Sequence, residues 1–117
     1  MVSEVGIGSL TENFRACQKI LTALGDQNRQ YLMIEMMQMG VCTGVRVGDI
    51  TEKTHLSRPA VSHHLQILKD AGIIKMREEG TKNFYYFDPD MEAFDLLINT
   101  LLEAKQVASA LPNRNEK

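Results

Sequence analysis

Side chains suited to recognition chemistry gather in one short segment, residues 57–64. They are Ser57, Arg58, Ser62, His63 and His64. An arginine guanidinium can donate a forked pair of hydrogen bonds to guanine, while serine and histidine can contact base edges or phosphates. The segment is therefore a candidate surface for reading nucleic acid.

Charge is distributed unevenly along the chain. The formal net charge is −2, which by itself argues against nucleic acid, because affinity for DNA comes largely from cations that displace counterions from phosphate. Residues 51–82, however, carry six cations and four anions, a balance of +2, so the rest of the chain carries −4. The three histidines of the chain also fall in residues 51–82. The positive part of the molecule is therefore central in the sequence.

The helix that would carry the candidate surface is well marked. Ser57 is a typical N-cap residue, Pro59 falls in the first turn, where its missing N–H costs nothing, and Gly72 stops the run. Apolar residues recur at helical spacing along one side: Ala60, Val61, Leu65 and Leu68. We expect this side to face the core, which leaves the polar side chains on the outer face.

A β-hairpin is predicted directly after this helix, over residues 73–87. Two β-prone runs, 73–76 and 84–87, are separated by a polar stretch. Gly80 lies in that stretch and supplies the positive φ that a hairpin turn often needs. We therefore expect two antiparallel strands that meet near Gly80.

A shorter helix is predicted before the capped one. Residues 45–47 alternate like a brief strand, and residues 49–54 have room for only a short helix. Short helix, tight turn, capped helix and hairpin, in this order, make a winged helix-turn-helix, whose second helix enters a DNA major groove. We place the helix-turn-helix at 48–72 and the wing at 73–87.

Helices are also expected at both ends of this unit. The run SLTE at 9–12 has the spacing of a capping box, which predicts a first helix over 10–24. Gly25 ends that helix, and Asp26 is the expected N-cap of a second one. The apolar face of the second helix is expected to include Tyr31, Ile34 and Met37.

The last helix is predicted over residues 89–110, because Asp88 followed by Pro89 pairs an N-cap with proline at the first helical position. The chain, 1–117, is then expected to form a single domain. It is mainly α with a β-hairpin wing, and it has about five helices.

Over residues 21–89 the chain resembles the ArsR/SmtB repressors. The likeness is carried by ALGDQNR at 23–29, by VGDI at 47–50, by LSRPAVSHHLQILKDAG at 56–72, and by REEG at 77–80 with the tyrosines at 85–86. The run S-x-P-x-V-S-H-H-L is quite specific. The resemblance implies a homodimer that joins through the first and last helices, here 10–24 and 89–110. It also implies an operator that is bound by the recognition helix and the wing, and an effector that weakens binding to the operator.

The same resemblance implies roles for particular residues. The recognition-helix residues that it makes base or phosphate readers are Ser57, Arg58, Ser62 and His63. Arg77 and Lys82 become wing contacts. His64 is included among the DNA-binding candidates, with local packing or hydrogen bonding as its alternative.

The residues at the positions that bind an effector differ from those of the metal-binding members of that family. Those members carry a C-x-C pair immediately before the aspartate that matches Asp49, because soft thiolates bind thiophilic metals and arsenite. The two positions here read Arg46 and Gly48, neither of which can ligate. Other members place histidines along the last helix, yet residues 91–110 contain no histidine or cysteine. We therefore expect no metal site and no cofactor, and the effector is left open.

The two cysteines, Cys17 and Cys42, are the remaining candidates for sensing. They are too few for a disulfide framework and too far apart for a CxxC motif. Some family members sense oxidants or sulfur species through cysteine pairs. The alternative is that both thiols are buried and inert.

Several classes of protein are disfavoured. No run approaches the roughly 18 apolar residues of a membrane span, and the N-terminus does not read as a secretory signal, so a cytoplasmic protein is expected. No phosphate-binding loop, nucleophile elbow or metal-hydrolase motif appears, so we expect no enzyme. Two alternatives to an effector-released repressor stay open: a constitutive DNA binder, and a winged helix used only for protein interaction.

Overall fold

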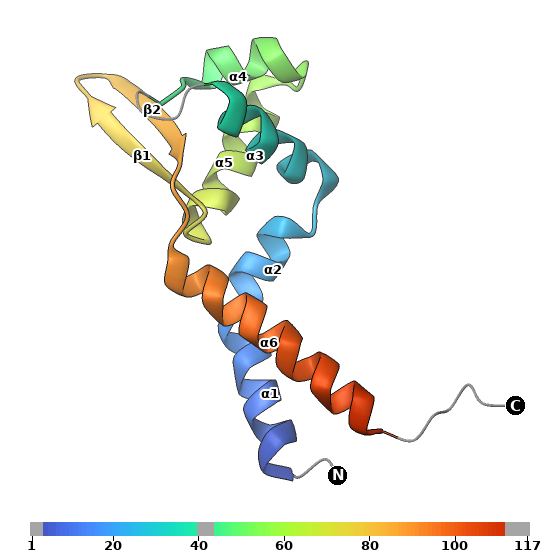
Figure 1. Cartoon of the computed structure of the whole chain (residues 1–117). Helices are drawn as coiled ribbons and strands as arrows, with labels where there is room; N and C mark the ends of the chain where they lie inside the picture. Colours follow the sequence, from blue (N-terminus) through green and yellow to red (C-terminus); the bar gives the residue numbers. More distant parts are fainter. Residues whose placement is uncertain (1–3, 40–43, 112–117) are drawn as a thin grey trace, which may run out of the picture.

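The computed structural model describes residues 4–39 and 44–111, which form six helices and one hairpin. The elements are α1 (Glu4–Ala16), α2 (Gln18–Leu24), α3 (Gln27–Met39), α4 (Val47–Thr54), α5 (Arg58–Asp70), β1 (Ile74–Glu79), β2 (Lys82–Phe87) and α6 (Met91–Ala110). In Figure 1 the hairpin projects to one side of the body, and α1 and α6 extend together away from it. The mainly helical winged helix-turn-helix expected from the sequence is confirmed, with six described helices in place of about five.

The predicted first helix, 10–24, is in fact two helices. α1 already begins at Glu4, so Ser9 lies inside a helix and the prediction that it caps one is wrong. The preceding residues continue the helical run, and the Ser-x-x-Glu spacing is equally compatible with a helix interior. Cys17 separates α1 from α2, but hydrogen bonds of Cys17 N to Asn13 O (3.0 Å) and Leu21 N to Cys17 O (2.9 Å) continue across it.

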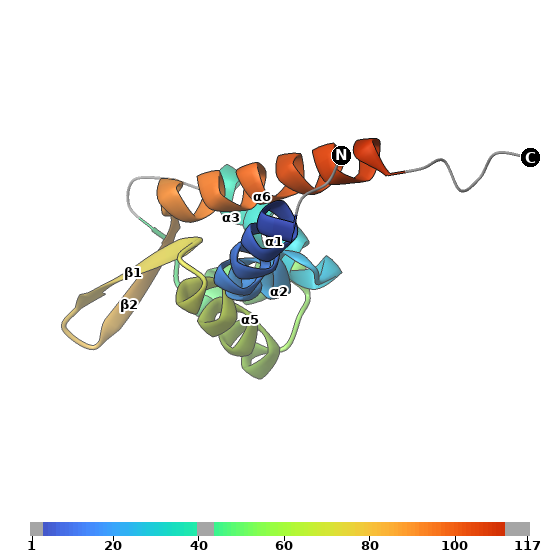
Figure 2. The same ribbon diagram turned by 90° about the horizontal axis from the view of Figure 1, so that it is seen from below.

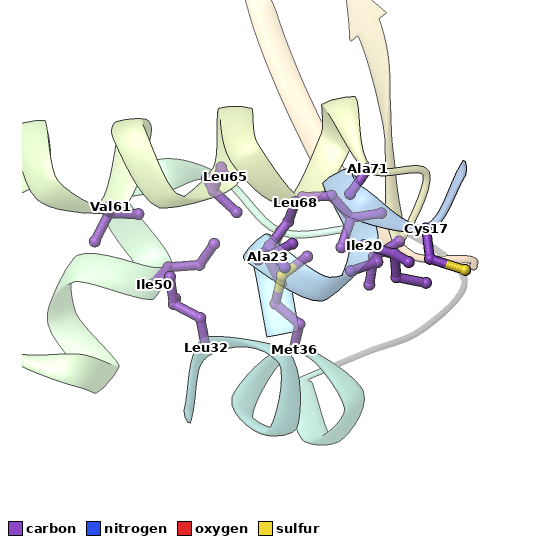
Figure 3. Packing of buried hydrophobic residues seen from close by; sticks show 13 residues of the cluster. Cys17, Ile20, Ala23, Leu32, Met36, Ile50, Val61, Leu65, Leu68 and Ala71 are labelled. Atoms are coloured by element: carbon purple, nitrogen blue, oxygen red, sulfur yellow. The ribbon is translucent and has the colours of Figure 1, made fainter. Parts of the chain in front are cut away.

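The hydrophobic core lies between α5 and the helices that precede it (Figure 3). Its buried apolar members are Cys17, Ile20, Ala23, Leu32, Met36, Val45, Ile50, Val61, Leu65, Leu68, Ala71, Ile73 and Ile74. Three of these, Val61, Leu65 and Leu68, form the inner face of α5 and have no exposed surface. α5 is therefore packed on side chains from α2, α3 and α4, which determines the direction of its outer face.

α3 faces the core with a different side from the one predicted. The predicted face is half exposed, at 42% for Tyr31, 51% for Ile34 and 43% for Met37. Leu32, Met36 and Arg29 are buried instead. The prediction of the α3 face is therefore wrong, because apolar residues surround most of this helix and leave its periodicity without a unique direction.

The wing is an antiparallel hairpin in which Ile74 pairs with Phe87 and Glu79 with Lys82. Gly80 lies at its turn with φ of +63°, as predicted. The brief strand expected at 45–47 is reduced to a single bridge between Val45 and Tyr85, which exchange hydrogen bonds of 2.7 and 2.8 Å. That bridge ties the segment before α4 to the base of the wing.

The last helix begins two residues later than predicted. Its N-cap is Asp90, whose Oδ1 accepts from Glu92 N at 3.0 Å. Asp90 N also donates to Gly72 O at 2.7 Å, which joins the end of α5 to the start of α6. Asp88, the predicted cap, instead pairs with Lys75 at 3.0 Å. The prediction is wrong because two aspartates compete for one helix start, and contacts outside the helix decide between them.

α6 packs against α1, and the two helices cross at an angle in Figures 1 and 2. Asn13 donates to Glu103 at 3.2 Å across this pair. Four large apolar residues on α6 stay at least half exposed: Met91, Ile98, Leu101 and Leu102. Within the described ranges, no helix is both long and apolar enough to cross a membrane.

Candidate nucleic-acid interface

The N-terminus of α5 is built by Ser57. Its backbone is extended, with φ of −68° and ψ of 155°, and its side-chain oxygen accepts from Ala60 N at 3.2 Å. Pro59 follows in the first turn. This arrangement leaves the positive end of the helix dipole exposed at Ser57, where an anion is favoured.

Beyond the cap, three polar residues of α5 lie on its outer face. Arg58, Ser62 and His63 are all exposed, as is Ser57. Arg58 and Ser62 are one turn apart, so they project from the same side of the helix. The structure therefore brings together the four recognition-helix residues that the sequence singled out, on a face opposite the core.

The turn between α4 and α5 determines the direction of α5. His55 adopts the left-handed conformation (φ of 61°) and donates its N–H to Thr51 O at 3.1 Å, which ends α4. Thr54 is buried, and its hydroxyl oxygen accepts from Leu56 N at 3.4 Å. His55 itself is exposed and makes no part of the α5 face.

The start of α4 occupies the place where metal-binding relatives would carry thiolates. Asp49 accepts from Arg46 N at 3.1 Å, so its carboxylate caps the helix. A Cβ placed on Gly48 would lie 3.7 Å from Nη1 of Arg58, an ordinary contact. Across the part of the chain that the structure describes, no group of three or more histidines, cysteines and carboxylates could hold a metal ion.

His64 differs from its neighbours on α5, because it is half buried and faces inward. Its Nδ1 lies 3.3 Å from Nη1 of Arg29, and its ring centroid lies 5.9 Å from that of His63. Burial is the main cause that lowers the pKa of His64 below its ordinary value of 6.5, and the charge of Arg29 lowers it further. Asp26 acts in the opposite direction. His64 is therefore favoured in its neutral form.

The two wing residues that were predicted to contact DNA, Arg77 and Lys82, have different surroundings. Lys82 is exposed at the start of β2. Arg77 donates from Nε to Glu79 at 2.6 Å, and its guanidinium carbon lies 5.1 Å from the centroid of the Phe84 ring. Arg77 is thus held on the wing by an anion of its own strand and by an aromatic face of the neighbouring strand.

Of the two cysteines, Cys17 lies in the part of the chain that the structure describes. Cys17 is buried, with Sγ 3.5 Å from Oγ1 of the buried Thr100 on α6. Cys42 falls outside the described residues. Cys17 thus belongs to the contact between the α1–α2 bend and α6.

Sequence reasoning gave no role to Arg29, a residue that joins three elements. Its Nε and Nη2 donate to Ala23 O and Thr22 O, both at 2.9 Å, and it contacts His64. The sequence contained a signal for an inward position of Arg29. It lies three residues before Leu32 and seven before Met36, the spacing of one helix face, and both of these residues are buried. An arginine on the inner side of a helix needs polar partners there.

The sequence matches known proteins over the same region. A model of the family described as "Bacterial regulatory protein, arsR family" matches residues 45–76, which run from before α4 into β1. An uncharacterised HTH-type transcriptional regulator of Methanocaldococcus jannaschii is 38% identical over 79 residues, which are 68% of this chain and 85% of that relative. The arsenical resistance operon repressor of Bacillus subtilis is 35% identical over 75 residues, 64% of this chain and 69% of that repressor.

The fold is also similar to that of solved structures. A homodimeric winged helix-turn-helix DNA-binding domain from Mycobacterium bovis superposes with a TM-score of 0.56 at 18% identity, and the match covers 97% of both chains. At this identity the likeness concerns the fold. Together with the sequence matches, it confirms the expected class, a transcriptional regulator rather than an enzyme.

Proposed function

Because this chain belongs to the ArsR family of bacterial regulatory proteins, we propose that it is a sequence-specific DNA-binding repressor of the cytoplasm. The observation that carries the proposal is the capped helix α5. Its inner residues have no exposed surface, and its outer face presents Arg58, Ser62 and His63 to solvent. A rigidly packed helix with such an outer face can enter a major groove and read base edges.

Contacts divide by position on this surface. Arg58, Ser62 and His63 face the bases, and Ser57 lies where the helix dipole meets a phosphate. Lys82 and Arg77 on the wing contact the backbone beside the groove. Base readers determine which sequence is bound, whereas the wing cations add affinity for any duplex.

The repressor acts as a homodimer through α1 and α6. Ile98, Leu101 and Leu102 of α6 are each at least half exposed in the single chain, although they are large and apolar. Burying them against a second copy would remove that surface from water. The similar Mycobacterium bovis domain is itself homodimeric. Two α5 helices related by a two-fold axis then enter successive major grooves, about 34 Å apart.

The effector that releases the repressor is not a thiophilic metal or zinc. This part of the proposal is supported by Arg46 and Gly48 at the thiolate positions and by the helix-capping role of Asp49. A sensor needs several ligands that converge on one ion. The thiols of Cys17 and Cys42 are the remaining candidates for a chemical signal.

The test begins with selection of a binding site from a random duplex library with the full-length protein. Ser62→Ala and His63→Ala should then reduce discrimination between the selected site and a scrambled one. Lys82→Ala should weaken both duplexes equally and reduce the slope of affinity against salt by about one unit. Lys19→Ala, which removes an exposed cation from α2, is the matched control and should change neither quantity. Failure to select any duplex, or equal behaviour of all four variants, would contradict the proposal.

A further inference from the structure

We propose that the contact between Arg29 and His64 positions the recognition helix, and that protonation of His64 breaks it and weakens operator binding. The inference rests on the proposed DNA-binding function. It assigns His64 to the inside of the molecule as a positioning residue, with Arg29 as its partner. It also gives the protein a sensitivity to acid that the DNA-reading residues do not explain.

Two nitrogen atoms of the Arg29 side chain, Nε and Nη2, cap the C-terminal end of α2. Arg29 is 8% exposed and donates to the carbonyl oxygens of Thr22 and Ala23, both at 2.9 Å. These residues lie in the last turn of α2, where Thr22 O also accepts from the N–H of Gly25 at 3.3 Å, and the guanidinium adds to the capping of this end. The guanidinium is therefore oriented by α2 before it reaches any other element.

The third nitrogen atom of this side chain reaches the recognition helix. Nη1 of Arg29 lies 3.3 Å from Nδ1 of His64. A guanidinium can only donate, so Nδ1 must accept, and the single ring proton of His64 must be on Nε2. This contact joins α5 to the end of α2 through one buried side chain, and it requires a neutral imidazole.

Burial opposes a second proton on His64, whereas the charges around it act in both directions. Arg29 on α3 and His63 on α5 disfavour the imidazolium, and Asp26, in the turn before α3, favours it. Of these charges Asp26 acts most strongly, but burial outweighs it, so the pKa of His64 is lowered overall. A proton on Nδ1 would place an N–H against the N–H of Arg29, so the hydrogen bond would be lost and two cations would face each other.

The consequence for binding follows from the order of the elements. α2 continues from α1, which packs on α6, so Arg29 connects the proposed dimerisation helices to α5. A dimer reads two half-sites only when its two recognition helices are correctly spaced and tilted. Loss of the contact removes a polar link between α5 and that frame while the core packing remains, so affinity for the operator falls and the fold persists.

The sign of the pH effect follows from linkage. The pKa of His64 is lowered in the folded protein, so the unfolded chain binds the proton first as pH falls below 6.5. The contribution of His64 to stability is therefore complete above pH 6.5 and is lost as pH falls from 6.5 through the lowered pKa. Operator affinity should follow the same direction and fall by up to about tenfold per pH unit for each proton taken up.

The experiment measures the affinity of the full-length protein for its selected duplex between pH 5.5 and 8 at constant ionic strength. A His63→Gln background is used, because a protonated His63 on the DNA face would strengthen binding in acid and mask the effect. In that background we expect affinity to be level near neutral pH and to fall as pH approaches the lowered pKa of His64, which is below 6.5. His64→Asn retains an acceptor near the position of Nδ1 but cannot titrate, so its affinity should stay level with pH.

Arg29→Lys provides a second, independent readout. Lysine keeps the charge but cannot span two α2 carbonyls and His64 together, so affinity at pH 7.5 should fall while circular dichroism still shows a folded protein. A His64→Asn profile that falls in acid like its parent, or wild-type affinity in a folded Arg29→Lys variant, would overturn the inference. If no duplex is selected at any pH, the proposed function fails instead, and the pH profile of unfolding still tests the contact.

Discussion

Nε of Arg77 donates to a carboxylate oxygen of Glu79 at 2.6 Å on the exposed wing. The cation proposed to contact phosphate is therefore paired within the protein, and it must exchange Glu79 for DNA. Exposed ion pairs of this kind contribute about 0–1 kcal/mol, so the exchange is feasible.

Glu79→Gln should strengthen DNA binding by up to about fivefold at low salt, which is the equivalent of about 1 kcal/mol. The change removes the charge that pairs with Arg77 and takes an anion from a surface that approaches phosphate. Fluorescence anisotropy with the selected and scrambled duplexes measures it, and both should gain. Glu78→Gln is the matched control, because it removes the same charge from the opposite face of the strand. Equal gains in the two variants would show that net charge matters and the pairing does not.

Ser57 combines two roles that substitutions can separate. Ser57→Ala removes the cap on α5 and should lower the free energy of unfolding by about 1 kcal/mol. Ser57→Asp keeps a capping oxygen but places a carboxylate where a phosphate is expected, so stability should be retained while operator affinity falls by more than about tenfold. Chemical denaturation and anisotropy measure the two quantities. Wild-type affinity in Ser57→Asp would place the start of α5 away from DNA.

Leu101→Glu should convert the dimer to monomers, because it places a charge in the proposed α6 interface at a cost of several kcal/mol. Sedimentation velocity measures the change. Ile34→Glu is the control: Ile34 on α3 is 51% exposed and Leu101 is 50% exposed, so both changes are equally mild for the single chain. Leu97 is less suitable, since it packs against the core. A dimeric Leu101→Glu protein would indicate another interface.

Zinc, cadmium, lead and arsenite should leave the protein bound to its operator. The reason is that the thiolate positions of metal-binding relatives are occupied by Arg46 and Gly48. The double variant Arg46→Cys, Gly48→Cys is an informative control, because the space beside Gly48 accepts a Cβ at ordinary contact distance. It should gain thiolate absorbance with cadmium while the parent shows none. Release of the parent by one equivalent of metal would reveal a site elsewhere.

Oxidants test the remaining thiols. If the cysteines carry the signal, peroxide or polysulfide should release the operator, and Cys42→Ser should abolish that release. Cys17 is buried against Thr100, so its reaction should be slow in the folded protein. Operator binding that is unchanged by either reagent would leave both thiols as structural residues.

Local sequence determined much of the DNA-reading unit. Ser57 caps α5 as its residue type predicts, and Gly80 occupies a positive φ at the hairpin turn. Val61 and Leu65 repeat at helical spacing, and they are the buried side of α5. These features depend on residues within a few positions of one another, so their patterns contain the necessary information.

Tertiary contacts decided the features for which local sequence offered more than one solution. Asp88 and Asp90 could each cap α6; Lys75 binds Asp88, and the carbonyl of Gly72 receives the N–H of Asp90. α3 is apolar on several sides, and its orientation depends on the carbonyls of α2 that Arg29 must reach. The inward direction of His64 has the same cause. By itself, the sequence determined the capped helix α5, the hairpin after it and the residues that the start of α5 exposes. Only the packing of α2 and α3 against α5 determined that Arg29 lies behind the recognition helix, because the pairing of a buried charge depends on residues distant in the chain.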